Sequence, residues 1–221
     1  MGPPTHSPKR LVVEGNDDKQ SVLSLARSRL QWSQSVEDSP VFIDIGGSAE
    51  EILKPAYLTA LLKTRELRIT GIMLDADDKP EGRYERIRNV CSEFFPALPK
   101  KMPDSGLIID NAEQKRFGAW IMPDNSCKGD LEIFLRYLVP ESSERVWEYA
   151  VECVKNAQAK GAPYHDSYIS KANLYTWLAW QNPPGQSPGV ALTKKILDPT
   201  SENATPFVNW FRELYELQEI Q

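Results

Sequence analysis

The sequence predicts an α/β fold, in which a mostly parallel sheet is flanked by helices and followed by a helical extension. Up to about residue 125, short runs rich in β-branched residues alternate with segments of helical periodicity, as in sheets built from crossover units. Beyond that point helical spacing dominates. A chain of 221 residues can bury a large core without disulfides. We therefore expect a flexible arm at 1–9, an α/β core at 10–125 and a helical extension packed on the core at 126–221.

The first strand and helix are predicted by a change of period. Residues 11–13 form an apolar run that ends at Glu14 and Gly15, which indicates a buried strand followed by a turn. Helical spacing then runs from Asn16, a good N-cap residue, to about residue 31. The alternation of strand and helix therefore begins close to the amino end of the chain.

The second and third strands are expected at 41–45 and 69–74. Between them, a glycine pair and a Ser48-x-x-Glu51 capping box predict one helix that runs to about residue 62. An acidic turn closes the third strand. These elements supply the first half of the expected parallel sheet.

The rest of the core is expected to contain one more helix and two more strands. The helix is predicted at 80–95, where Pro96 stops it, and the strands at 107–109 and 119–122. In the extension, an aromatic stretch at 174–180 has the helical spacing that is typical of a buried core or a domain seam.

Charge and cysteine content exclude several classes of protein. The net charge is −5, from 26 basic and 31 acidic residues, which disfavours a broad basic surface that coats nucleic acid. An enzyme that reaches nucleic acid through bound metal ions stays open. Three cysteines without Cys-x-x-Cys spacing indicate free thiols in a reducing compartment. No apolar run approaches a membrane span, and the start lacks a signal core, so we expect a cytoplasmic protein with no membrane contact.

Acidic residues close two of the predicted strands. Glu14 ends the first strand, Asp75 and Asp77 follow the third, and Asp18 lies one helical turn beyond Glu14. The carboxyl ends of parallel strands open into one crevice, and crowded carboxylates are costly unless a cation binds between them. Mg²⁺ or Mn²⁺, which prefer oxygen ligands, would satisfy this arrangement. The sequence therefore predicts a divalent metal site.

These acids, in this order along roughly residues 9–125, resemble the Toprim domain, a Rossmann-like fold found in topoisomerases, bacterial-type primases and overcoming-lysogenization-defect nucleases. The stretches 129–132 and 176–181 resemble an uncharacterised bacterial Toprim-like family of unknown function that is related to those nucleases. The sequence lacks a recognisable tyrosine nucleophile and the partner domain of primases and topoisomerases. Phosphodiester hydrolysis is the Toprim activity that remains.

The resemblance implies a role for each acid. Glu14 would be a metal ligand or general acid/base, while Asp75 and Asp77 would hold Mg²⁺ as catalytic residues. Asp18 falls where related nucleases carry an additional acid, and Asp124, after the last strand, would be a further ligand.

Each acid also has a purely structural explanation, as a turn residue or a charge in the first turn of a helix. Two functions therefore stay open. The first is Mg²⁺-dependent hydrolysis of nucleic acid. The alternative is a non-catalytic Toprim-like module that binds metal or a partner protein such as an ATPase.

Overall fold

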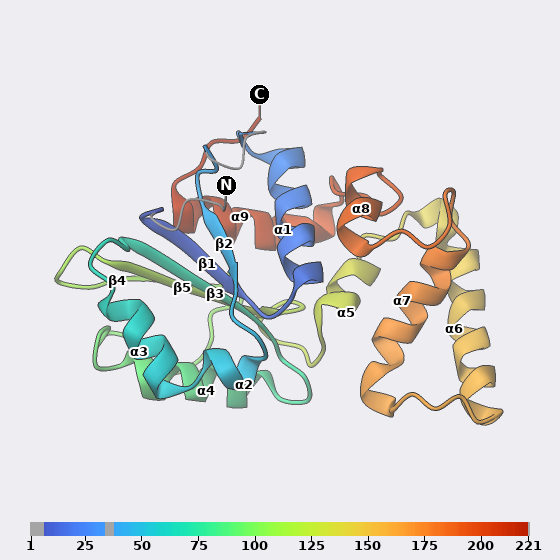
Figure 1. The fold of residues 1–221 in the computed structure, drawn as a ribbon, viewed down its shortest axis with the longest axis horizontal. Helices are drawn as coiled ribbons and strands as arrows, with labels where there is room; N and C mark the ends of the chain where they lie inside the picture. Colours follow the sequence, from blue (N-terminus) through green and yellow to red (C-terminus); the bar gives the residue numbers. More distant parts are fainter. Residues whose placement is uncertain (1–6, 34–37, 221) are drawn as a thin grey trace.

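A mixed sheet of five strands forms the centre of the molecule in the computed structural model, which describes residues 7–33 and 38–220. The strand order is β2-β1-β3-β5-β4, and only β4 runs antiparallel to its neighbour (Figure 1). The strands are β1 (Lys9–Val13), β2 (Phe42–Ile45), β3 (Ile69–Asp75), β4 (Leu107–Asp110) and β5 (Arg116–Met122). The expected α/β fold with a mostly parallel sheet is confirmed.

Helices cover both faces of this sheet. Figure 1 shows α1 and α9 on one face and α2, α3 and α4 on the other. Helices α5 to α8 lie beyond the carboxyl ends of the parallel strands. The α-helices are α1 (Asn16–Arg29), α2 (Ala49–Ile52), α3 (Pro55–Lys63), α4 (Pro80–Cys91), α5 (Leu131–Arg136), α6 (Glu144–Ala159), α7 (Ile169–Ala179), α8 (Pro188–Thr193) and α9 (Thr205–Tyr215). Within the described ranges, none combines the length and apolar character needed to cross a bilayer.

Alternation along the strands produces two separate apolar cores. Leu11 and Val13 of β1 pack in the core under α1 and α9, whereas Val12 points into the core under α2, α3 and α4. Successive side chains of a strand point to opposite faces, so a strand buried on both faces is apolar throughout. This explains why the continuous apolar run at 11–13 forms a central strand.

The last α-helix of the chain packs directly on the sheet. Gly71 of β3 and Gly118 of β5 stand side by side in the sheet, and Leu214 of α9 packs over both. A Cβ atom at Gly118 would lie 2.5 Å from a methyl carbon of Leu214. The hydroxyl of Tyr215 donates to the Arg10 carbonyl oxygen at 2.8 Å. Paired glycines therefore open the groove that α9 fills.

Three predicted helix boundaries were wrong. The single helix expected after Ser48 is two helices, because Pro55 lacks an N–H group and restricts the residue before it. Ser48 does accept a hydrogen bond from the Glu51 N–H at 3.4 Å, as expected. The helix expected at 80–95 ends at Cys91, and the last residues before the proline form hydrogen-bonded turns. At the start of α1, Gly15 occupies the N-cap position that we assigned to Asn16.

The termini and the cysteines complete the description of the fold. Of the arm expected at 1–9, residues 1–6 lie outside the described residues, and Lys9 already belongs to β1. All the cysteines are free, as expected. Burial raises the pKa of the Cys91 thiol to about 12, so this thiol is unreactive at neutral pH.

Candidate functional site

Glu14 links three elements at the carboxyl edge of the sheet. One of its oxygens accepts a hydrogen bond from the Asp75 N–H at 2.8 Å, and the other accepts from the Ala49 N–H at 2.8 Å. Burial raises the pKa of Glu14, although these two hydrogen bonds oppose the shift. Glu14 is therefore a half-buried group held in a fixed orientation, and a solvated turn residue is excluded.

Asp18 lies beside Glu14 in the first turn of α1. It is buried, and its Oδ2 accepts a hydrogen bond from the Gly15 N–H at 2.9 Å. Burial, with a smaller contribution from the negative charge of Glu14, raises the pKa of Asp18 to about 7. Asp18 thus caps its helix but is too buried and too close to another acid to be only a first-turn charge.

Asp75, the last residue of β3, is the most strongly perturbed of these acids. Burial and, after it, the charges of the surrounding carboxylates together raise its pKa to about 9. These neighbours, with Asp75 itself, define what we call the acidic cluster: Glu14, Asp18, Asp75, Asp130 and Glu132. The structure therefore brings together three of the acids that the sequence singled out, from two strand ends and one helix.

Asp130 and Glu132 join the cluster from the start of α5. Asp130 caps this helix through a 2.9 Å hydrogen bond to the Ile133 N–H. Glu132 is buried, with its Oε1 3.4 Å from Lys171 Nζ. Burial and then Asp130 raise the pKa of Glu132, whereas Lys171 lowers it. The sequence had marked this stretch only as part of a resemblance. The available signal was an acidic cap and first turn directly after a strand end.

Asp77 lies next to the acidic cluster without being one of the acids that perturb Asp75. The residue is exposed, with a positive φ of 52°, and its carboxylate pairs with Arg83. Its backbone N–H bonds to the Gly129 carbonyl at 2.9 Å, which ties the loop after β3 to the loop before α5. The charge of Asp77 still contributes to the raised pKa of Glu14.

Asp124 has a local role in the turn after β5. Its Oδ1 accepts hydrogen bonds from the N–H groups of Cys127 at 2.7 Å and Ser126 at 3.0 Å. Burial acts to raise the pKa of Asp124, but these hydrogen bonds outweigh burial and lower it. The structure does not bring this side chain among the acids that perturb Asp75.

The oxygen donors of the acidic cluster are of the type that binds a hard divalent cation, but they are not arranged around a common point. Over residues 7–33 and 38–220, no group of three His, Cys, Asp or Glu side chains is placed to hold a metal ion. The carboxylates of Glu14, Asp18 and Asp75 instead accept hydrogen bonds from backbone N–H groups. Carboxylate oxygens carry further lone pairs, and oxygen donors are what Mg²⁺ prefers. The residues therefore fit a cation chemically, and side-chain rotation is needed to close them around it.

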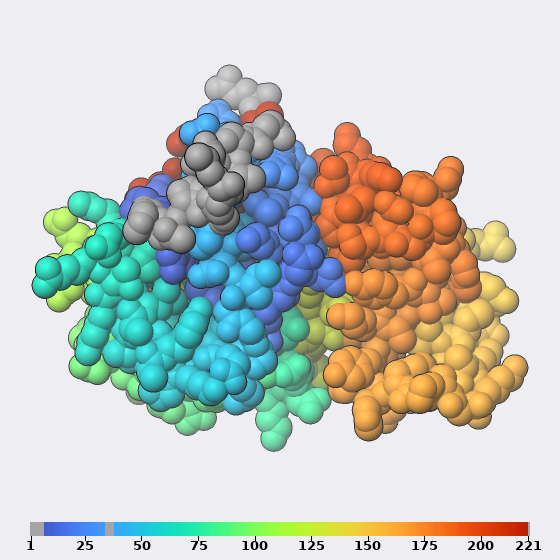
Figure 2. Space-filling model, viewed as in Figure 1, coloured from blue at the N-terminus to red at the C-terminus, as the bar shows by residue number. Residues whose placement is uncertain are grey.

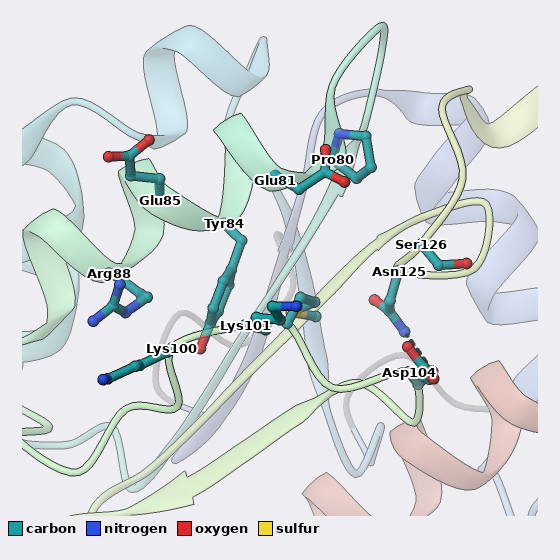
Figure 3. A pocket seen from close by; sticks show the side chains of 11 residues that line it. Pro80, Glu81, Tyr84, Glu85, Arg88, Lys100, Lys101, Asp104, Asn125 and Ser126 are labelled. Carbon is teal, nitrogen blue, oxygen red and sulfur yellow. Dashed lines mark hydrogen bonds between the residues drawn. The ribbon is translucent and has the colours of Figure 1, made fainter.

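A pocket of about 410 Å³ lies between α4 and the loop before β4 (Figure 3). Asn125 donates to the Asp104 carbonyl at 3.1 Å at one end of it. Its charged lining residues balance, with three basic and three acidic side chains: Arg88, Lys100, Lys101, Glu81, Glu85 and Asp104. The acids that perturb Asp75 do not line this pocket, so we place the candidate site at the acidic cluster.

A family model for DUF3226, described as a protein of unknown function, matches residues 8–216. The chain belongs to the DUF3226 family. The match covers both the sheet and the helices that follow it. The acidic cluster, with its α5 residues, therefore lies within the part of the chain that the family model matches. The expectation of an uncharacterised family is confirmed. A relationship of DUF3226 to Toprim proteins or to overcoming-lysogenization-defect nucleases stays a prediction.

A further similarity covers only part of this DUF3226 chain. A putative truncated GMC-type inactive oxidoreductase of Acanthamoeba polyphaga mimivirus is 29% identical over 109 residues. These residues are 48% of this chain and 26% of the relative, so the match spans about a quarter of that protein. No solved structure matches the chain significantly.

Proposed function

We propose that this protein is a divalent-cation-dependent phosphodiester hydrolase that acts on nucleic acid. The observation that carries the proposal is the convergence of Glu14, Asp18 and Asp75 at the carboxyl edge of the sheet, where burial raises the pKa of each and neighbouring carboxylates add to the shifts. Such crowding destabilises a fold unless protons or cations relieve it. Strongly shifted acids at one edge are typical of functional sites.

The geometry supports a division of roles within the cluster. Asp18 and Asp75 would hold the cation, which supplies positive charge against the phosphate oxygens. Glu14, oriented by two N–H groups, would accept the proton of an attacking water while the leaving oxygen of the phosphodiester takes up a proton. Asp77 would join the ligands by releasing Arg83.

The α5 acids extend the same site. Asp130 and Glu132 face Asp75 closely enough to raise its pKa, so they supply carboxylates for a second cation on that side. Two-cation sites stabilise both the attacking and the leaving oxygen of a phosphodiester. Asp124 is the weakest of the proposed ligands, because its Oδ1 already accepts the hydrogen bonds of its own turn.

A non-catalytic module that binds metal or a partner such as an ATPase is the second candidate. The observation in its favour is that the acids bind backbone N–H groups of distant segments: Glu14 bonds Ala49 and Asp75, and Asp75 bonds Leu131. In that case the cluster would hold the strand ends together, and a bound cation would stabilise the fold without taking part in catalysis.

Cleavage assays separate the two candidates. The chain would be incubated with plasmid, single-stranded DNA and RNA in Mg²⁺ and Mn²⁺, alongside Glu14→Gln and Asp75→Asn. We expect cleavage by the wild type and its loss in both variants while circular dichroism shows a folded chain. Asp78→Asn is the matched control, since Asp78 is an exposed acid of the same loop. Wild-type activity in both variants, or inactivity of the wild type together with measurable cation binding, would exclude hydrolysis at this site.

A further inference from the structure

Helix α7 borders the acidic cluster and contacts it through its first two turns. The Ser170 hydroxyl donates to Asp130, and Lys171 lies 3.4 Å from Glu132. One turn later, the Tyr175 hydroxyl donates to Asp17 at 2.6 Å, beside Asp18 on α1. The helix therefore forms one wall of the site, although it belongs to the helical segment that follows the sheet in the sequence.

An exposed aromatic and basic surface begins at Tyr168, the N-cap residue directly before α7, and continues along the first two turns of the helix. Tyr168 is 55% exposed and Tyr175 is 37% exposed, and Lys171 lies between them with its Nζ 5.8 Å from the Tyr175 ring centroid. At 100° per residue these positions fall within about 60° of one another around the helix. We call this surface the α7 stripe (Tyr168, Lys171, Tyr175).

The chemistry of the α7 stripe suits unpaired nucleotides. Exposed aromatic faces stack on bases, and a lysine between two rings can neutralise a phosphate. Bases in a duplex already stack on one another, so only an unpaired strand offers its faces to such rings. The stripe is about 10 Å long, at 1.5 Å per residue over seven residues, which is the scale of a few nucleotides.

Charge on the rest of the molecule argues against a duplex substrate. Duplex binding without base contacts needs many Lys and Arg contacts to phosphate, and the chain carries a net charge of −5. Figure 2 shows the surface hollowed between the loop after β3 and α7, with α5 at its floor. A single strand on α7 would reach the acidic cluster across that hollow.

We infer that the α7 stripe binds single-stranded nucleic acid and delivers an unpaired strand to the acidic cluster, as its juxtaposition with Asp17, Asp130 and Glu132 indicates. This inference rests on the proposed function, because it names the substrate class of that site.

The test measures binding separately from cleavage. A fluorescent 12-nucleotide single strand and a 12-base-pair duplex are titrated against the full-length chain carrying Asp75→Asn in EDTA, where no cation-dependent cleavage takes place. We expect tighter binding of the single strand. Tyr168→Ala should weaken that binding at least about five-fold, the lower end for loss of one stacked base, and Tyr168→Phe should retain it. Tyr149→Ala is the control, because Tyr149 is an equally exposed tyrosine that stacks on Trp180 outside the stripe.

The outcomes distinguish failure of this inference from failure of the proposed function. Equal binding of single strand and duplex, or unchanged binding after Tyr168→Ala, overturns the role of the α7 stripe even if the wild type cleaves nucleic acid. Single-strand binding that depends on Tyr168, in a chain whose wild type cleaves nothing, upholds the stripe and removes the hydrolase. Absence of single-strand binding overturns the inference.

Discussion

Asp75 Oδ1 accepts a hydrogen bond from the Leu131 N–H at 2.9 Å, which joins the end of β3 to the start of α5 across 56 residues of sequence. This contact sets Asp130 and Glu132 beside an acid that the strand pattern had already marked. It also means that Asp75 can keep its hydrogen bond when its charge is removed, whereas Glu14 uses both of its oxygens as acceptors. Several predictions about charge and stability rest on this difference.

Thermal stability should fall as the pH rises without divalent cations. The pKa of Asp75 rises from 3.8 to about 9 and that of Asp18 from 3.8 to about 7 on folding. Between the ordinary and the raised values the folded chain binds more protons than the unfolded chain, so the free energy of unfolding decreases with pH. We expect Tm in EDTA to drop by roughly 3 °C or more from pH 5 to pH 9, about 1 kcal/mol at this chain length. A Tm that increases over this range would contradict the buried cluster.

Asp75→Asn should flatten that dependence. The amide oxygen keeps the Leu131 hydrogen bond while the charge that costs stability at high pH is gone. We expect the variant to exceed the wild type in Tm by a few °C at pH 9 and to differ little at pH 5, in parallel melts followed by circular dichroism. Asp78→Asn, in the exposed part of the same loop, should track the wild type at both pH values.

Glu14→Gln should destabilise the fold even though it also removes a negative charge. A glutamine offers one carbonyl oxygen, so either the Ala49 or the Asp75 N–H faces an NH₂ group that cannot accept its hydrogen bond. A buried donor left without a partner costs about 1–3 kcal/mol. Urea unfolding at pH 7 should show a lower midpoint with an unchanged slope. A midpoint equal to that of the wild type would mean that these hydrogen bonds contribute little.

Mg²⁺ should stabilise the wild type more at pH 8 than at pH 5. A cation that binds carboxylates competes with the protons held by Asp18 and Asp75, so its apparent affinity increases as those protons leave. We expect 10 mM Mg²⁺ to raise Tm measurably at pH 8, by an amount that grows with the logarithm of the ratio of the Mg²⁺ concentration to Kd. Asp18→Asn should reduce the shift, while Asp124→Asn, which lies outside the acidic cluster, should leave most of it. A shift that is independent of pH and of Asp18 would place the cation elsewhere.

Gly118→Ala should destabilise the sheet. The added Cβ would lie 2.5 Å from a Leu214 methyl carbon and 3.1 Å from the Leu107 carbonyl oxygen, so α9 has to shift. Overpacking of this kind costs about 1–3 kcal/mol. Gly82→Ala is the control, because its Cβ would meet nothing closer than 3.8 Å on helix α4, and alanine favours a helix. Equal midpoints for Gly118→Ala and the wild type in urea would contradict tight packing of α9.

The parts of the fold that depend on local periodicity could be predicted. The apolar runs at 11–13 and 69–74 became central parallel strands, because burial on both faces requires apolar residues at every position. Glu14 and Asp75 follow those runs directly, so their place at one sheet edge followed from strand direction alone. The helix break at Pro55 also follows from the sequence, because proline restricts the residue before it to extended backbone.

Other features depend on contacts between distant segments and left no local pattern. Asp77 also follows the third strand in the sequence, yet in the structure it has a positive φ and its exposed carboxylate pairs with Arg83. The assignment of α9 to the core depended on two glycines that meet only once β3 and β5 pair.

The sequence by itself determined the α/β class, the central strands and the acids at their ends, because side-chain alternation and strand polarity are properties of short segments. Only the tertiary structure decided that Asp130 and Glu132 join those acids, that Asp124 stays in its turn, and that α7 forms a wall of the site. Those outcomes depend on hydrogen bonds and packing between segments far apart in the chain. Local periodicity does not specify which distant segments come together.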